Sequence, residues 1–151
     1  MNILMLLKPK SEVEYLTDTC TLRQGLEKMR VHGYTAIPVI SKDGLYVGSV
    51  SEGDFLWHIV NHAEQIDCIQ KCENYRIREI MKPDRNPAVT VDVKMEQVVE
   101  RATHQNFIPV TDDRGYFIGI VTRQDIIKKL CGIDARQTVS AVHDTYRTYS
   151  S

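Results

Sequence analysis

The chain has 151 residues, and its 19 Lys and Arg against 20 Asp and Glu give a formal net charge of −1 at pH 7. This balance lacks the strong positive field with which proteins bind nucleic acids or anionic membranes, so neither partner is expected. Hydrophobic residues make up 42% of the chain and only four are cysteines. We therefore expect a folded body with its own core and reduced thiols, not a disulfide-stapled secreted domain.

The chain opens on an apolar run, residues 1–7, which Lys8 and Pro9 end well short of the roughly 20 residues that a membrane-spanning helix needs. The run also lacks the basic start and the small-residue cleavage site of a signal peptide. The expected location is therefore the cytoplasm.

The first predicted elements lie between residues 21 and 60. Leu22, Leu26 and Met29 recur at helical spacing and predict an amphipathic helix over residues 21–32. A hairpin follows, with a strand at 36–40, a turn at 42–44 and a strand at 45–50. Ser51 then begins a second helix, in which Trp57 is predicted to pack between helices.

The same pattern returns 71 residues later. Residues 38–54 read PVISKDGLYVGSVSEGD, and residues 109–125 read PVTDDRGYFIGIVTRQD. The second copy predicts a strand at 88–91, a helix over 95–102, strands at 107–110 and 116–121, and a helix from Thr122. The match extends upstream, because Leu7-Lys8-Pro9 and Met81-Lys82-Pro83 precede the two copies.

The repeat divides the chain into two units, residues 1–60 and 79–131. Residues 61–78 are polar and form a predicted connector with a helix-compatible stretch at 63–72, and residues 132–151 form a tail without apolar periodicity. Each unit would be a three-stranded sheet with helices on one side. Because such a unit cannot bury its sheet alone, we expect the two units to pack face to face.

Each copy places a hydroxyl at a helix start and a carboxylate three residues later, at Ser51 and Asp54 and at Thr122 and Asp125. One interpretation is capping, in which the hydroxyl accepts a backbone N–H and the acid sits in the first turn. The other is nucleotide binding, with N–H groups for phosphate and the carboxylate for ribose hydroxyls. The glycines three residues before each hydroxyl would let the ligand approach the backbone. Recurrence in both copies favours the second interpretation.

On these repeated motifs the chain resembles the cystathionine-beta-synthase-type, or CBS, domains, which occur in tandem as Bateman modules. The resemblance covers residues 6 to 130 approximately. It implies an α+β fold of two pseudo-symmetric repeats packed sheet to sheet, with clefts between them for adenine nucleotides such as AMP, ADP, ATP, S-adenosylmethionine or cyclic dinucleotides. It also implies a stand-alone regulatory module without catalysis, a homodimer, and an effector protein as partner.

Carried onto this sequence, the resemblance implies two clefts. In one, Thr122 and Asp125 would hold ribose and phosphate, and adenine would lie against Leu6, Leu7, Tyr34, Thr35, Ala36 and Ile37. In the other, Ser51 and Asp54 would take the polar role between walls formed by Ile80, Met81, Phe107 and Ile108. The candidate phosphate partners are Arg123 and Lys82, followed by Arg30, His32 and His104.

The two clefts are expected to differ. Arg123 supplies a positive charge at the Asp125 cleft, whereas the first copy has Gly53 beside Glu52, whose carboxylate repels phosphate. We therefore expect the ligand at the Asp125 cleft. Some members of the family carry a basic residue before each hairpin strand, where this chain has Thr35 and Asn106. This difference counts against strong polyphosphate binding.

Two alternatives stay open. The module could be a structural or protein-interaction unit with empty clefts. It could also be a metal-linked protein, because His58 and His62 are four residues apart, as are Cys68 and Cys72, and such a set could bind zinc tetrahedrally. These spacings are also ordinary helical periodicity, so no metal is predicted. The sequence contains no nucleophile elbow and no phosphate-cradling Walker loop, so neither an enzyme nor a cofactor is expected.

Overall fold

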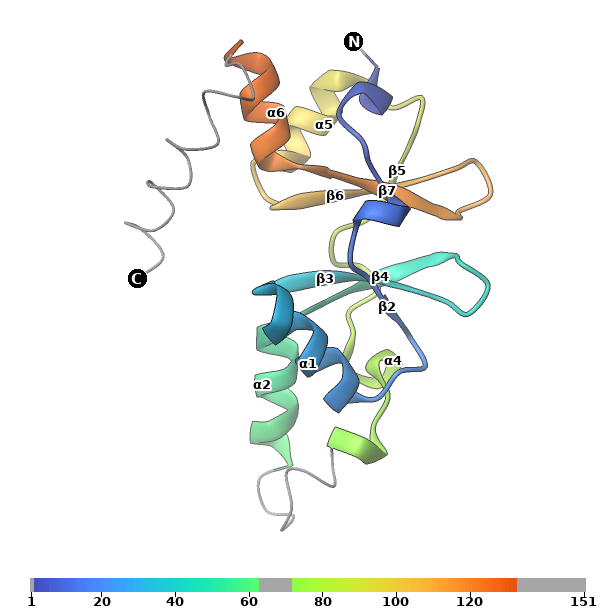
Figure 1. The fold of residues 1–151 in the computed structure, drawn as a ribbon, viewed down its shortest axis with the longest axis vertical. Helices are drawn as coiled ribbons and strands as arrows, with labels where there is room; N and C mark the ends of the chain where they lie inside the picture. Colours follow the sequence, from blue (N-terminus) through green and yellow to red (C-terminus); the bar gives the residue numbers. More distant parts are fainter. Residues whose placement is uncertain (1, 63–71, 133–151) are drawn as a thin grey trace.

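The structure is a computed structural model that describes residues 2–62 and 72–132. Two β-sheets face each other across the middle of the molecule, and helices cover their outer faces (Figure 1). The predicted α+β class and sheet-to-sheet packing of two similar units are confirmed. Residues 63–71 and 133–151, which include most of the expected connector helix and nearly all of the tail, lie outside the described residues.

The first sheet has the strand order β2-β3-β4, from β2 (Leu16–Thr17), β3 (Ala36–Ile40) and β4 (Tyr46–Ser51). Its outer face carries α1 (Leu22–His32) and α2 (Glu52–Asn61). A capping box between Thr21 and Gln24 starts α1, and Gly33 ends it in the left-handed conformation at φ 68°. These elements bury one core, which includes Leu22, Met29, Ile37, Val39, Val50 and Phe55.

The second sheet repeats this plan with one more strand. β5 (Val89–Thr90), β6 (Phe107–Thr111) and β7 (Phe117–Thr122) correspond to the first sheet, and α5 (Met95–Ala102) and α6 (Arg123–Leu130) cover its outer face. The fourth strand, β1 (Lys8–Pro9), comes from the start of the chain and pairs antiparallel with β7. The core includes Val89, Val98, Ile108, Val110, Val121 and Ile126.

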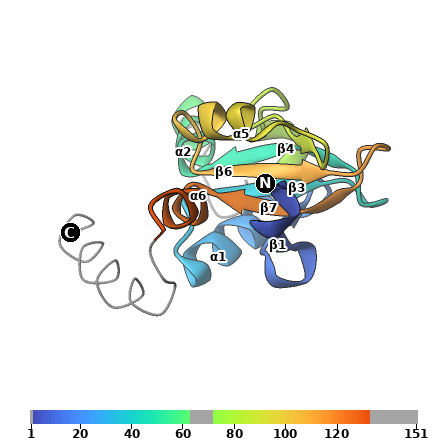
Figure 2. The ribbon, with the colours of Figure 1, turned by 90° about the horizontal axis from the view of Figure 1, so that it is seen from above.

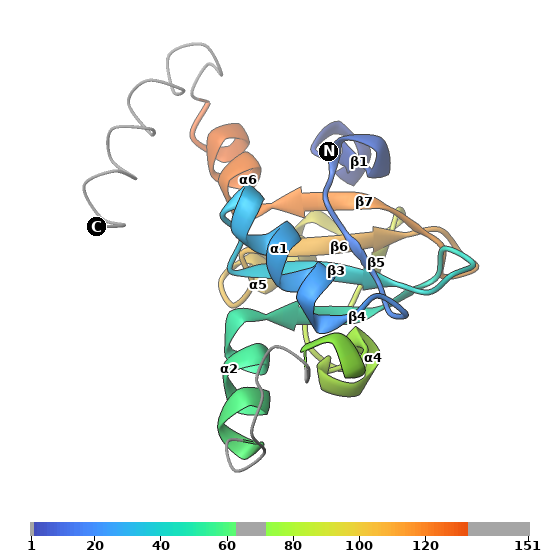
Figure 3. The same cartoon turned by 60° about the horizontal axis from the view of Figure 1, so that its bottom comes forward.

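Each repeat is completed by the segment that precedes the other repeat. A short 3-10 helix, η1 (Ile3–Met5), puts fully buried Ile3 into the second core before the chain crosses through β1 and η2 (Lys10–Glu12) to the first sheet (Figure 3). In return, α4 (Ile77–Ile80) puts fully buried Ile77 into the first core before the chain crosses back. The two repeats therefore exchange their leading segments.

Gly48 and Gly119 mark the points where these crossing segments touch the sheets. A Cβ at Gly119 would lie 2.1 Å from the Lys8 carbonyl oxygen, and a Cβ at Gly48 would lie 3.0 Å from the Pro83 Cα and 3.1 Å from the Lys82 carbonyl oxygen. We expected these glycines to admit a ligand. The structure corrects this expectation, because the backbone that approaches them belongs to the protein's own crossing segments.

The β3–β4 and β6–β7 turns project together from one end of the sandwich (Figure 2). The backbone N–H of Tyr46 donates to the Gly115 carbonyl, and that of Phe117 donates to the Gly44 carbonyl. Trp57 on α2 is 65% exposed, so it does not pack between the described helices of this chain, and its place at an interface between helices stays a prediction. Within residues 2–62 and 72–132, every helix is too short or too polar to cross a membrane.

Candidate functional site

The start of α6 holds the hydroxyl and carboxylate pair of the second copy. Thr122 Oγ1 accepts the backbone N–H of Asp125 at 3.1 Å and donates to Asp125 Oδ2 at 2.7 Å. Lys8 Nζ, which arrives on β1, lies 3.7 Å from the same carboxylate oxygen. The Asp125 side chain keeps 22% of its surface exposed and that of Lys8 keeps 47%. The pair therefore caps the helix and still presents a carboxylate to solvent.

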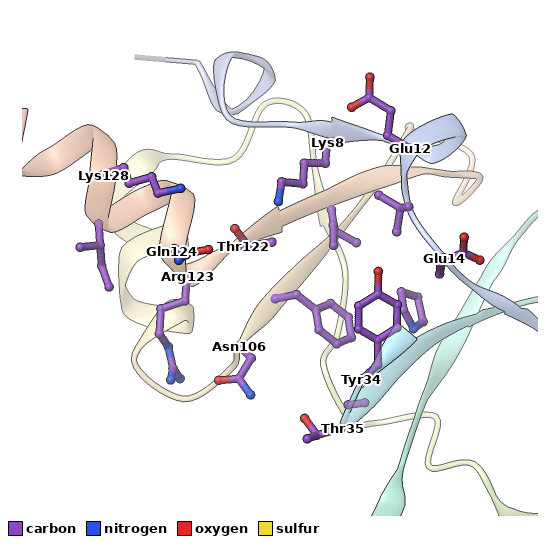
Figure 4. Close-up of a pocket in the computed structure, with 17 residues that line it drawn as sticks. Lys8, Glu12, Glu14, Tyr34, Thr35, Asn106, Thr122, Arg123, Gln124 and Lys128 are labelled. Atoms are coloured by element: carbon purple, nitrogen blue, oxygen red, sulfur yellow. The ribbon is translucent and has the colours of Figure 1, made fainter. Parts of the chain in front are cut away.

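A cavity of about 720 Å³ opens beside this helix start (Figure 4). Its volume lies within the range of about 300–1,000 Å³ that is typical of small-molecule sites. Both repeats and the N-terminal crossing segment line it. The lining residues that bear on ligand binding are Lys8, Glu12, Glu14, Tyr34, Thr35, Ala36, Pro38, Asn106, Phe107, Thr122, Arg123, Gln124 and Lys128.

Positive charge gathers on the α6 side of the cavity. Lys8 reaches from the crossing segment toward Thr122, and Lys128 lies one helical turn further along α6 (Figure 4). Arg123 also lines the cavity, but its Nε donates to the Ala102 carbonyl at 2.6 Å, which ties the guanidinium to the end of α5. The α6 N-terminus adds its own partial positive charge. This side of the cavity is therefore suited to an anionic group.

Negative charge lies on the opposite wall, on the segment that leads to β2. Glu14 is neutralised there, because Lys28 Nζ lies 3.2 Å from one of its carboxylate oxygens and His32 Nε2 lies 3.5 Å from the other. The Glu12 carboxylate points upward, out of the cavity, in Figure 4. The cavity thus has one cationic end and one end with paired or outward-facing acids.

Apolar surface joins the two ends. The Tyr34 ring, 39% exposed, stacks on His32 with 5.7 Å between ring centroids and 18° between planes. Ala36 and Pro38 of β3 and Phe107 of β6 complete this wall. A planar heteroaromatic group can pack on such a surface, since aromatic and apolar contacts do not depend on one hydrogen-bond pattern.

The cavity brings together five of the residues predicted for this cleft, namely Tyr34, Thr35, Ala36, Thr122 and Arg123, with Asp125 directly behind Thr122. Three others lie elsewhere. Alternation along β3 turns Ile37 away into the first core, Leu6 is buried in the second core, and Leu7 packs against that core. His32 contributes only from behind Tyr34, and Arg30 and His104 lie outside the lining of the cavity.

The pair in the first copy has a different environment. Ser51 and Asp54 form a full capping box at the start of α2, in which Ser51 Oγ accepts the Asp54 N–H and Asp54 Oδ2 accepts the Ser51 N–H. The guanidinium of Arg85 contacts both side chains, with Nη1 at 2.7 Å from Ser51 Oγ and 2.5 Å from Asp54 Oδ2. The Asp54 side chain is only 3% exposed. This carboxylate is therefore already bound by the protein itself.

The walls predicted for this second cleft do not assemble around Asp54. Met81 lies over Gly48, and Lys82 pairs through its backbone with Ser49. Phe107 lines the Asp125 cavity instead, because β6 turns it toward that side. Ile108 is fully buried in the second core, while Ile80 packs on the first. The structure thus separates the residues that sequence reasoning placed together here.

The residues of the metal alternative are only partly described. His58 on α2 and His62, which directly follows the helix, lie together with ring centroids 4.3 Å apart, and the Tyr75 ring lies 4.4 Å from that of His58. Cys68 lies outside the described residues. Within the described ranges, no group of three or more His, Cys, Asp or Glu side chains could hold a metal ion.

Sequence reasoning missed the cavity residues Lys8, Pro38, Gln124 and Lys128, and it missed Arg85. The signal for Lys8 was present, because Leu7-Lys8-Pro9 and Met81-Lys82-Pro83 repeat ahead of the two copies. That signal did not show that each tripeptide joins the other repeat. Arg85 carried no signal, since the residue aligned with it, two positions after Pro9, is the uncharged Ser11.

Comparison with known proteins places the site in context. The sequence pattern of the CBS domain matches residues 6–61 and again residues 77–132. An uncharacterized protein of Methanocaldococcus jannaschii is 29% identical, in a match that covers 67% of this chain and 76% of that protein. One from Methanopyrus kandleri is 30% identical over 105 residues, and the chain spans only 49% of its length. A homoserine O-acetyltransferase of Methanohalophilus mahii is 27% identical, over 23% of that enzyme.

Solved structures share the fold. A hypothetical conserved protein of Geobacillus kaustophilus superposes with a TM-score of 0.79 at 26% identity, over 87% of this chain and 97% of that one. CBSX2 in complex with AMP gives a TM-score of 0.70 at 23% identity, with the same two coverages. CbpB of Listeria monocytogenes in complex with c-di-AMP gives 0.75 at 22% identity, over 85% of this chain and 93% of that one.

Proposed function

We propose that this chain, which belongs to the CBS domain family, is a regulatory module that binds an adenine nucleotide between its two repeats. The observation that carries the proposal is the cavity beside Thr122 and Asp125, which both repeats line and which has one cationic end and one apolar wall. The structures of CBSX2 with AMP and of CbpB with c-di-AMP support this ligand class. Both are similar to this chain in fold.

The proposed pose follows the chemistry of the cavity. Adenine would pack on the apolar wall of Tyr34, Ala36 and Phe107, and the ribose hydroxyls would donate to the exposed carboxylate of Asp125. The phosphate would lie at the α6 N-terminus between Lys8 and Lys128. Because Arg123 is tied to the Ala102 carbonyl, two lysines and one helix end carry the phosphate, which favours a monophosphate over a triphosphate.

The proposed signal is a change in how the repeats sit against each other. A ligand that touches Tyr34 in one repeat, Thr122 in the other and Lys8 on the crossing segment favours the arrangement in which all three contacts can form. It shifts the equilibrium only by its difference in affinity for the two arrangements. We propose that a homodimer surface and an effector protein receive this change, and that the module itself performs no catalysis.

Isothermal titration calorimetry with AMP, ADP, ATP, S-adenosylmethionine and c-di-AMP tests the proposal. We expect at least one adenine nucleotide to bind, and Asp125→Ala to weaken it at least tenfold because the ribose loses its acceptor. Asp113→Ala, which changes an exposed carboxylate in the β6–β7 turn, is the matched control and should bind normally.

If none of these compounds binds at millimolar concentration, the alternative of a structural or protein-interaction unit with empty clefts is favoured. If Asp125→Ala binds the ligand with unchanged affinity, the ligand does not bind at the Asp125 cleft and the proposed site is wrong.

A further inference from the structure

Arg85 lies in the crossing segment between Lys82 and β5 and points its guanidinium into the Ser51–Asp54 cleft. A single nitrogen, Nη1, donates to Ser51 Oγ at 2.7 Å and to Asp54 Oδ2 at 2.5 Å. The Arg85 side chain is 28% exposed, whereas that of Asp54 is 3% exposed. The guanidinium thus covers a carboxylate that has almost no access to solvent.

The loop that carries Arg85 is fixed by hydrogen bonds from β4. Tyr46 Oη donates to the Asn86 carbonyl at 2.6 Å, and Ser49 Oγ donates to the Arg85 carbonyl at 3.4 Å. Asn86 adopts φ 52°, a conformation that asparagine tolerates better than most residues. These contacts hold the backbone so that the guanidinium of Arg85 faces Asp54, which makes the contact a built feature of the loop.

Among the residues that the structure describes, none makes a corresponding contact in the Asp125 cleft. Its nearest cation, Lys8, stays 3.7 Å from the carboxylate and is 47% exposed, and Asp125 itself is 22% exposed. When Pro9 is aligned with Pro83, the residue in the place of Arg85 is Ser11, whose side chain carries no charge. The two clefts therefore differ in their occupant, although their helix-start motifs are the same.

We infer that Arg85 is an internal occupant that keeps the Ser51–Asp54 cleft shut. Its guanidinium makes to Ser51 and Asp54 the hydrogen bonds that ligand hydroxyls would make. An anion alone cannot open this cleft, since it would leave the buried Asp54 carboxylate without its cation and with only the Ser51 N–H as a donor. A nucleoside phosphate can, because its ribose hydroxyls replace the lost donors while its phosphate receives the released guanidinium. Only this last step rests on the proposed function.

Chemical rescue tests the occupancy without any nucleotide. Arg85→Ala should lower the melting temperature by several degrees, because the buried Asp54 carboxylate loses its cationic partner. Guanidinium chloride at about 20 mM, far below the molar range that denatures, should restore at least half of this loss. Potassium or methylammonium chloride at the same concentration should not. Arg114→Ala, at an exposed arginine of the β6–β7 turn, is the control and should respond to neither salt.

Arg85→Lys and Arg85→Gln keep the test decisive if Arg85→Ala folds poorly. Lysine should keep more stability than glutamine, since it retains a cation for Asp54. The inference is overturned if guanidinium acts equally on Arg85→Ala and on the wild type. It is also overturned if Arg85→Ala and Asp54→Asn show additive losses in a double-mutant cycle, because then the two side chains are not coupled.

The nucleotide arm measures stoichiometry. With AMP as the probe, the wild-type chain should bind one molecule tightly and a second one more weakly, because the second must displace Arg85, and Arg85→Gln should bind the second molecule with a changed affinity. A wild-type chain that binds only one molecule at millimolar AMP would overturn the release step. If AMP binds neither protein while guanidinium still rescues Arg85→Ala, the proposed function fails and the internal occupant stands.

Discussion

The substitution Gly119→Ala should detach the N-terminal strand from the second repeat. The added Cβ would lie 2.1 Å from the Lys8 carbonyl oxygen and 2.9 Å from the Leu7 side chain. Neither the β1 backbone nor β7 can absorb this overlap within a normal strand spacing of about 4.8 Å. We therefore expect β1 to move away and to carry η1 with it.

The magnitude follows from what β1 anchors. Ile3 is fully buried and Leu6 is 9% exposed, and both belong to the second core. Burying one such side chain contributes about 1.5–3 kcal/mol, so exposing both lowers the free energy of unfolding by roughly 3–6 kcal/mol as an upper value. A domain of this kind has a total of about 5–15 kcal/mol, so the variant would be severely destabilised.

Two glycines serve as matched comparisons. At Gly48 the nearest atom to an added Cβ is the mobile Met81 Cε at 2.6 Å, with backbone no closer than 3.0 Å, so Gly48→Ala should cost about 1–3 kcal/mol. At Gly53, in the first turn of α2, the nearest atom is Ser51 Oγ at 3.6 Å, and Gly53→Ala should stabilise by up to about 1 kcal/mol.

Urea unfolding gives the three free energies, and amide hydrogen exchange reports on the β1–β7 pairing. The expected order of stability is Gly53→Ala, wild type, Gly48→Ala and Gly119→Ala. If Gly119→Ala is as stable as Gly48→Ala, or if the amides of β1 and β7 keep their protection, the close approach of Lys8 does not hold β1 in place and this reasoning is refuted.

Three further predictions concern single side chains. Ile77→Ala should lower the free energy of unfolding by about 2–5 kcal/mol in urea, because this fully buried residue completes the core of the other repeat; a loss below 1 kcal/mol would contradict the exchange of segments. Tyr46→Phe should cost about 1 kcal/mol, since the Asn86 carbonyl loses its donor. Burial raises the pKa of the Tyr46 hydroxyl above its ordinary value of about 10. The stability that the neutral hydroxyl contributes is therefore complete below pH 10 and declines as the pH rises further. Measured over a pH series, the free energy of unfolding should fall less steeply above pH 10 in Tyr46→Phe than in the wild type. Lys8→Ala should change the free energy of unfolding by less than about 1 kcal/mol, because the ion pair of Lys8 with Asp125 is partly exposed. The same substitution should weaken AMP binding and reduce the salt dependence of that binding. If calorimetry gives the same AMP affinity as for the wild type, Lys8 is not part of the proposed phosphate site.

The sequence predicted those parts of the fold that depend on local pattern. The strand predicted at 36–40 coincides with β3, and the helix predicted over 95–102 coincides with α5. Both could be predicted because runs of β-branched residues and the spacing of apolar residues are local properties of the sequence. The capping box at Ser51 and Asp54 followed from the same local chemistry. The α+β class followed from repetition, since neither copy could bury its sheet alone.

What the sequence did not predict depends on contacts between distant segments. Arg85 reaches Asp54 only because the crossing segment brings its loop over β4, and no periodicity encodes that approach. Ile37 was placed at the cleft because its neighbours are there, yet strand alternation sends it into the core. Gly119 was predicted to contact a ligand because a glycine in a strand indicates that another group approaches the backbone closely. The glycine does not indicate whether that group is a ligand or, as here, the protein's own backbone.

The exchanged leading segments constrain the order in which the chain can fold during synthesis. Lys8 pairs with Ile120, so β1 has no partner until nearly the whole described chain has left the ribosome. Until then, Ile3 and Leu6, which are later buried in the second core, stay open to solvent and to other nascent chains. The first repeat likewise lacks Ile77 until its own strands have long been made. The first core is complete once the α4 segment with Ile77 has been made, whereas the second core awaits β7, so we expect the first repeat to become protease-resistant before the second.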